Sequence, residues 1–222
     1  EARFIVAVAC AVPADTCFCA AMGTGPEPDG VYDVGLAELD DADGHRFVAW
    51  ARSSEGAERL RALELEPAPL DDLVAAAGEL EASRTRQTRS IELEGLPGRL
   101  LAADDARWAE AASTCLACGS CTSVCPSCGC TEDREELDLD GTSSHVRRWS
   151  SCFDPEFGYV HGGPLALSIT ERFRGFVTHK LATSILEDGV ADCVGCGRCV
   201  TWCPAGIDLP EVVRKVAPME GA

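Results

Sequence analysis

The first third of the chain alternates short apolar runs with turn residues. Residues 4–9 form an apolar run rich in β-branched side chains, which predicts a buried core strand. Residues 31–39 and 46–51 have the composition of two further strands, joined by a turn of acidic and glycine residues around residue 43. Residues 10–30 contain several prolines and glycines, which indicates a loop.

The spacing of apolar residues then changes to that of amphipathic helices. Ser53 and Ser54 are suited to cap a helix from residue 55 to about residue 65. A second helix is predicted over residues 70–88. The apolar face expected for this second helix consists of Leu73, Val74, Ala77 and Leu80.

The remaining elements are mostly helical. A helical stretch is predicted after Pro97 and includes Trp108. A hairpin is predicted around residues 131–149, followed by a helix over about residues 169–186. The last predicted element is an amphipathic helix over residues 209–216.

The charge of the chain narrows the choice of partners. Its 222 residues include 37 acidic and 19 basic ones, which gives a formal net charge of −18. Hydrophobic residues make up 46% of the chain, which is enough for a packed core. A negative surface repels phosphate backbones, so no nucleic acid partner is expected. Such a surface either steers docking onto a basic redox partner or only favours solubility. The longest apolar stretch, residues 4–12, is too short for a transmembrane segment.

Two cysteine runs carry the most specific chemistry. Residues 115–126 read CLACGSCTSVCP and residues 193–204 read CVGCGRCVTWCP, which is the C-x2-C-x2-C-x3-C-P spacing of bacterial-type [4Fe–4S] ferredoxins. Gly119, Gly195 and Gly197 allow the positive φ angles that turn backbone N–H groups toward a cluster. The fourth cysteine of each run is expected just beyond, on a short helix. The sequence therefore predicts at least two iron–sulfur clusters.

Zinc and disulfides are the alternatives to this interpretation. Structural zinc usually combines two C-x2-C pairs across a longer spacer, whereas each run here supplies four cysteines and ends in Cys-Pro. Disulfides require an oxidising compartment, and the start of the chain has no apolar core of a signal peptide. Both are less favoured than clusters, and we expect a cytoplasmic location with reduced thiols.

In two-cluster ferredoxins the fourth cysteine of each run binds the cluster of the other run. The ligands expected for cluster I are Cys115, Cys118, Cys121 and Cys203. The ligands expected for cluster II are Cys193, Cys196, Cys199 and Cys125. Irons that are fully capped by sulfur suit single-electron transfer better than substrate binding.

These patterns predict an α+β protein. Residues 1–66 are expected to form a small α/β module, residues 67–112 a helical connector, and residues 113–222 a dicluster ferredoxin-like domain with a long insert at residues 127–192. The chain begins at Glu1, without Met, close to a predicted strand. We therefore expect the first module to be truncated.

The remaining cysteines are candidates for a third site. They are Cys10, Cys17, Cys19, Cys128, Cys130 and Cys152. A third cluster or a zinc ion, small buried hydrophobic side chains, and a redox-active thiol pair all remain open. Spacing alone does not select the ligands of such a site.

Other motifs add little. His161, in the segment HGGP, is the most suggestive histidine, but a lone histidine is more often a surface or capping residue. The sequence has no P-loop, no G-x-G-x-x-G and no G-x-S-x-G pattern. The chain therefore offers no nucleotide site and no serine nucleophile of its own.

Several segments together resemble one protein family. Residues 10–26, 115–130, 148–152, 161–163 and 193–208 resemble the beta subunit of cytoplasmic sulfhydrogenases, which are [NiFe]-hydrogenases coupled to NAD(P)(H). They are also similar to the A subunit of anaerobic sulfite reductase. The resemblance covers essentially the whole chain, and the motifs MGTGP and CPxCxC are its most specific part.

The resemblance implies an iron–sulfur electron-transfer subunit that is not itself a complete enzyme. Such a subunit lies beside a flavin- and NAD(P)-binding subunit and exchanges electrons with a catalytic subunit, either a hydrogenase or a sulfur or sulfite reductase. In these families the additional cysteines fall in recurring motifs, and the chain is usually longer at its N-terminus. Two other functions stay open: a sulfur-compound reductase acting at the additional cysteines, and a structural or assembly module.

Metal analysis tests the cluster prediction. Protein that is purified without oxygen should contain about eight iron atoms per chain, because each [4Fe–4S] cluster holds about four. About twelve iron atoms would support a third cluster. Tightly bound zinc in place of iron would contradict the interpretation of both runs.

Overall fold

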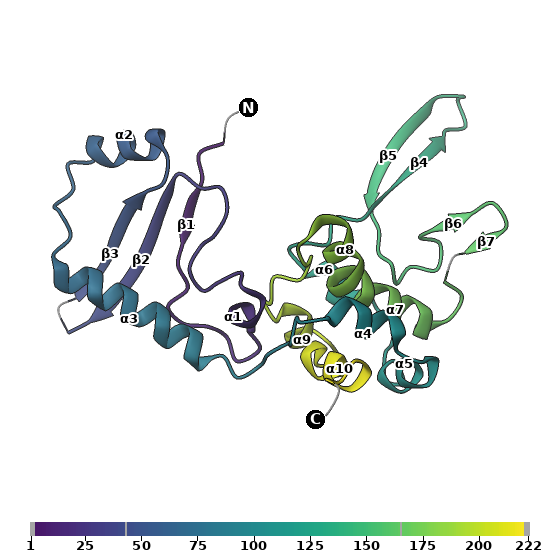
Figure 1. Cartoon of the computed structure of the whole chain (residues 1–222). Helices are drawn as coiled ribbons and strands as arrows, with labels where there is room; N and C mark the ends of the chain where they lie inside the picture. The colour runs from purple at the N-terminus through teal and green to yellow at the C-terminus, as the bar shows by residue number, and fades with distance from the viewer. Residues whose placement is uncertain (1–2, 43, 165, 220–222) are drawn as a thin grey trace. The chain divides into compact units, whose positions relative to one another are not determined.

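The computed structural model describes residues 3–42, 44–164 and 166–219. The chain divides into two compact units, Glu1–Ser90 and Ile91–Ala222. Helices and β-strands occur in both units, so the chain has the predicted α+β class (Figure 1). Within the described part of the chain, no helix is long and apolar enough to cross a membrane.

The first unit is built on a three-stranded mixed sheet. Its strands are β1 (Val6–Val8), β2 (Val34–Asp41) and β3 (Gly44–Ala51), in the order β1-β2-β3. β1 runs parallel to β2, and β2 runs antiparallel to β3. The predicted strand pair is confirmed, whereas residue 43 of the predicted turn lies outside the described residues.

Helix α3 (Leu70–Arg86) packs against this sheet (Figure 1). The core between them consists of Ala9, Ala37, Leu39, Val48 and Ala76. The helix is confirmed, and Leu80 of its predicted apolar face packs against this core. The rest of that face is wrong, because Leu73 is 48% exposed, Val74 is 64% exposed and Ala77 is exposed. Instead Asp72 accepts a 2.7 Å hydrogen bond from Arg46 of β3. This ion pair holds Asp72 against the sheet and turns the row of small residues inward.

Strand β1 lies at the edge of the sheet and is not buried as predicted. Val6 and Val8 are 48% and 57% exposed, whereas Ala9, just beyond the strand, is buried. Val6 and Val8 are exposed because the small core lies mainly under β2 and β3, and because an edge strand pairs on one side only.

Helix α2 (Ser54–Ala62) begins at the predicted cap. The Ser53 Oγ accepts a 3.0 Å hydrogen bond from the Gly56 N–H and donates a 2.6 Å hydrogen bond to Asp33. A Cβ at Gly56 would lie 2.1 Å from the Asp33 carbonyl oxygen, so only glycine lets α2 approach the start of β2 this closely. The capped N-terminus and the close contact at Gly56 together fix the position of this helix.

The second unit is mainly helical. Besides two one-turn helices in the cysteine runs, its helices include α4 (Leu96–Ala102), α5 (Asp105–Ala111), α7 (Ile169–Thr178), α8 (Ser184–Asp188) and α10 (Leu209–Val216). Their core includes the fully or almost fully buried Leu96, Leu100, Trp108, Val177, Leu181 and Val216. The helical stretch predicted after Pro97 is interrupted, because Asp104 caps the start of α5. The helix predicted over residues 169–186 is interrupted by a π-helical turn, η1 (His179–Thr183), between α7 and α8.

The insert at residues 127–192 has two different parts. The predicted hairpin is confirmed as β4 (Thr131–Leu137) and β5 (Ser143–Trp149), which extend away from the helices of this unit (Figure 1). A second small hairpin pairs β6 (Tyr159–Val160) with β7 (Gly163–Pro164). The exposed His161 lies in the turn between these two strands. The helical remainder of the insert, from α7 to α8, belongs to the core of the unit.

The segment expected as a connector, residues 67–112, is shared between the two units. Its first helix, α3, packs against β2 and β3 in the first unit. Its other helices, α4 and α5, pack against α7 in the second unit. The boundary between the units lies at Ser90 and Ile91, within this segment.

The cap of α2 can be tested by hydrogen exchange. Ser53→Ala removes the acceptor for the Gly56 N–H and should destabilise the helix by about 1 kcal/mol. Amides of residues 54–62 should then exchange about fivefold faster in mass spectrometry. Ser54→Ala is the matched control and should leave the exchange unchanged, because Ser53 and not Ser54 forms the cap. Equal effects of both substitutions would contradict the assigned cap.

Candidate iron–sulfur centre

The two cysteine runs follow the same backbone path. Helix α6 (Ser120–Ser123) begins after Gly119 and helix α9 (Arg198–Thr201) begins after Gly197, with φ angles of 73° and 68° at the two glycines. In each run the N–H groups three and four residues beyond the glycine donate to the glycine carbonyl. The two short helices also pack against each other. The sequence repeat is therefore a structural repeat.

The cysteines occupy equivalent places in the two runs. The third ones, Cys121 and Cys199, lie on the short helices, and the fourth ones, Cys125 and Cys203, follow where the helices end. The expectation of a fourth cysteine on a helix is therefore wrong. Each helix is only one turn long, and the proline after the fourth cysteine cannot donate a further helical hydrogen bond.

A left-handed residue in each run directs a backbone N–H toward sulfur. Gly195 has φ 64°, and Ala117 at the equivalent place has φ 50°. The Ala117 N–H donates a 3.4 Å hydrogen bond to the Cys115 sulfur. A side chain in this region costs about 1–2 kcal/mol. The first run thus tolerates local strain at the position where the N–H meets the cysteine.

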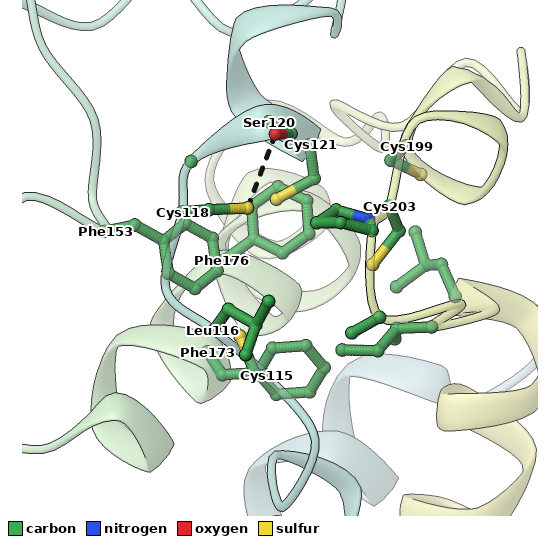
Figure 2. Close-up of a pocket in the computed structure, with 15 residues that line it drawn as sticks. Cys115, Leu116, Cys118, Ser120, Cys121, Phe153, Phe173, Phe176, Cys199 and Cys203 are labelled. Atoms are coloured by element: carbon green, nitrogen blue, oxygen red, sulfur yellow. Dashed lines mark hydrogen bonds between the residues drawn. The ribbon is translucent and has the colours of Figure 1, made fainter.

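One cavity gathers the cysteines predicted for cluster I. The sulfurs of Cys115, Cys118, Cys121 and Cys203 face one space (Figure 2). Cys199 also lines this cavity. Apolar side chains complete the walls, and they include Leu116, Phe153, Phe173, Phe176, Ile207 and Leu209. Thiols around an apolar space, with an N–H donor to one of them, fit a sulfur-ligated cluster.

Burial controls the protonation of these thiols. It raises the pKa of Cys115, and it raises the pKa of Cys121 to about 12. Cys203 lies close enough to Cys115 to raise the pKa of that thiol further. Cys118 differs, because it is exposed and a hydrogen bond with Ser120 lowers its pKa. Since metal ligation requires thiolates, loading of this site would release protons.

The cysteines predicted for cluster II also lie together. Burial raises the pKa of Cys193, and it raises the pKa of Cys199 to about 12. Cys125 and Cys196 are close enough to raise both pKa values further. The fold therefore brings Cys125 to the second run, just as it brings Cys203 to the first.

Sequence reasoning missed one charged residue of this site, Lys180. Its side chain is only 4% exposed, and its Nζ donates a 3.0 Å hydrogen bond to the Ser127 Oγ. The Nζ also lies 5.8 Å from the centre of the Phe176 ring. Burial alone would lower the pKa of Lys180, but the adjacent Cys125 and Cys128 sulfurs raise it overall. The available signal was its position on the apolar stripe of the helix that begins at Ile169.

The additional cysteines of the second unit lie near this centre. Cys128 hydrogen-bonds to Cys125, which lowers the pKa of Cys125 and raises that of Cys128. Cys152 is close to Cys130 and to Cys121. Cys128 and Cys152 therefore lie beside the predicted cluster ligands Cys125 and Cys121.

The additional cysteines of the first unit lie in its loop. Cys10 is exposed, whereas Cys17 and Cys19 are partly buried on either side of the completely buried Phe18. Cys19 begins the short helix α1 (Cys19–Met22), and Gln87 donates a 3.3 Å hydrogen bond to its sulfur. Across the described ranges, no three His, Cys, Asp or Glu side chains converge as a single metal ion requires. A third cluster or zinc site thus stays a prediction.

The sequence of this chain is similar to those of known proteins. Residues 114–207 match the family model of the 4Fe-4S dicluster domain. Over 229 aligned residues the chain is 34% identical to sulfhydrogenase 2 subunit beta of Pyrococcus furiosus, and the match covers 96% of this chain and 63% of that relative. No solved structure matches the chain. The resemblance to sulfhydrogenase beta subunits is confirmed.

Crossed ligation makes a reciprocal prediction. Cys125→Ala should release the cluster of the second run, and Cys203→Ala should release that of the first, so iron falls from about eight to about four atoms in each variant. Mass spectrometry after alkylation identifies which thiols have lost protection. Alkylation is expected at Cys193, Cys196 and Cys199 in the first variant. Alkylation at the cysteines of the first run instead would contradict the crossing.

Proposed function

We propose that this homologue of sulfhydrogenase beta subunits is an electron-transfer subunit with two [4Fe–4S] clusters. Cluster I is held by Cys115, Cys118, Cys121 and Cys203. Cluster II is held by Cys193, Cys196, Cys199 and Cys125. The clusters relay single electrons between a flavin- and NAD(P)-binding subunit and a catalytic subunit, in the cytoplasm, where thiols are kept reduced.

The observation that carries this proposal is the proximity of the two cysteine sets. Cys199 of the second set lines the same cavity as the first set and lies near Cys121. Helices α6 and α9 pack against each other and keep the two sets adjacent. Bound clusters would supply one-electron chemistry at two fixed, neighbouring positions. The protein provides the thiolates, the N–H donors and the apolar walls.

The surface around cluster I is suited to exchange with a partner. Cys118 is exposed, and the neighbouring Leu116 is 65% exposed. Cluster I would therefore have one side near solvent, where a redox partner can approach. The net charge of −18 favours a partner with a basic docking face.

The catalytic partner is proposed to be a hydrogenase. The relative is a sulfhydrogenase subunit by name, which favours hydrogenase over a sulfur or sulfite reductase. The chain spans about 63% of that relative. We propose that it nevertheless works in a complex of the same kind, with partner subunits of the same kind.

Activity assays of the chain alone and of the assembled complex test the relay. The chain with its clusters should be reduced reversibly, yet show no turnover alone with a low-potential dye and polysulfide or sulfite. In the assembled complex, Cys196→Ala should abolish NAD(P)-linked hydrogen metabolism. Dye-linked activity at the catalytic subunit is the internal control and should remain, because the dye bypasses the relay.

Two outcomes would favour the other functions. Turnover by the lone chain would show that it is a sulfur-compound reductase. Full NAD(P)-linked activity in a complex without reducible clusters would show that the clusters only support the structure.

A further inference from the structure

We propose that Lys180 and Ser127 form a hydrogen-bonded path to the Cys125 sulfur, and that this path raises the reduction potential of cluster II and not of cluster I. The inference rests on the proposed ligand assignment. It concerns residues outside the ligand set, which position charge around it.

The chemistry of the three groups sets the direction of the hydrogen bonds between them. Lys180 Nζ donates to the Ser127 Oγ at 3.0 Å, and the Ser127 Oγ lies 3.3 Å from the Cys125 sulfur. An ammonium group has donors and no acceptor, so the hydroxyl accepts from Lys180. As a cluster ligand the Cys125 sulfur would be a thiolate, which can only accept, so the Ser127 hydroxyl would donate to it. The positive charge therefore acts on the sulfur through this hydroxyl as well as directly from the adjacent ammonium.

Burial shows that this charge needs a negative partner. Lys180 is 4% exposed, and within the described chain it forms no ion pair with a carboxylate. A buried charge is costly unless it is paired. The groups that face it are the Ser127 hydroxyl, the Phe176 ring and the cysteine sulfurs, including Cys125 and Cys128. Thiolates and the sulfides of a cluster would provide the compensating negative charge.

Lys180 lies within a π-helical turn, His179–Thr183, between α7 and α8. Phe176 and Leu181 on the same segment are buried in the core of the unit, which holds this segment in place. Turns of this kind are frequent at functional sites. Here the turn carries a buried cation.

The second cysteine run serves as an internal comparison. Ser127 follows Cys125 and Pro126, and Ala205 follows Cys203 and Pro204 at the equivalent place. Alanine has no hydroxyl group, so the fourth cysteine of cluster I receives no such bond. Arg172 is a cation near Cys115, but no serine links it to Cys203 in the described structure. The hydrogen-bonded path therefore distinguishes the two clusters.

The effect follows from the charge of the reduced cluster. Accepting one electron makes a cluster more negative, and a nearby cation and a hydrogen bond to a ligand sulfur stabilise that state. No proton or other reactant is needed for this step. Removing the hydroxyl or the ammonium should thus make cluster II harder to reduce.

Redox titration of the cluster-loaded chain, followed by electron paramagnetic resonance, tests the inference. Ser127→Ala should lower one of the two midpoint potentials so that the ratio of reduced to oxidised cluster falls about tenfold at a fixed potential, which is about 59 mV for one electron. Lys180→Met should lower the same potential. Ala205→Ser should raise the other potential. Ser123→Ala is the matched serine control and should change neither, because the Ser123 Oγ donates to the Gly119 carbonyl and, within the described residues, not to a sulfur.

Iron content separates the possible failures. If Ser127→Ala keeps its iron and both potentials stay unchanged, or if both shift equally, the inference is overturned. Should Lys180→Met not fold, Ser127→Ala and Ala205→Ser still decide the question. A wild-type chain without reducible clusters would overturn the proposed function itself, and the missing iron would identify that case.

Discussion

The convergence of the two cysteine runs is the constraint on which the second unit depends. Each run can form its tight loop locally, but a fourth cysteine reaches the other run only if α6 and α9 pack together. The helical core supplies the necessary rigidity, because Leu96, Trp108 and Val216 are almost fully buried around the runs. Burial raises the pKa of Cys121 and Cys199 to about 12, so these two ligands would lose their protons when metal binds. Cys118 and Cys125 differ, because hydrogen bonds lower their pKa.

The insert between the runs is part of this centre. The helix that begins at Ile169 supplies Phe173 and Phe176 to the wall of the first cavity, and one turn later it supplies Lys180 beside Cys125. A single helix thus gives one cysteine set an apolar boundary and the other a buried cation. On the proposed ligand assignment, this division would give the two clusters different potentials, which is useful for directed electron transfer.

The first unit presents a different surface. Its sheet has a small core of alanine, valine and leucine side chains, and the edge strand β1 leaves Val6 and Val8 exposed. Its cysteines lie in a loop anchored by the buried Phe18. Exposed apolar side chains on a sheet edge are typical of surfaces that pair or pack with another chain or segment. This agrees with the proposal that the chain works in a complex.

The sequence by itself determined what depends on neighbours along the chain. It predicted the loops at Gly119 and Gly197, the Ser53 cap and the hairpin over residues 131–149, because local hydrogen bonds and φ preferences set them. The tertiary structure decided which face of α3 is buried, because the contact between Arg46 and Asp72 joins two distant elements. It also decided that Lys180 lies beside Cys125, because the packing of the insert brings these two distant residues together. The apolar periodicity places Lys180 on the buried face of its helix, but a single sequence does not show which distant group a buried side chain contacts, which is why only the fold reveals these pairs.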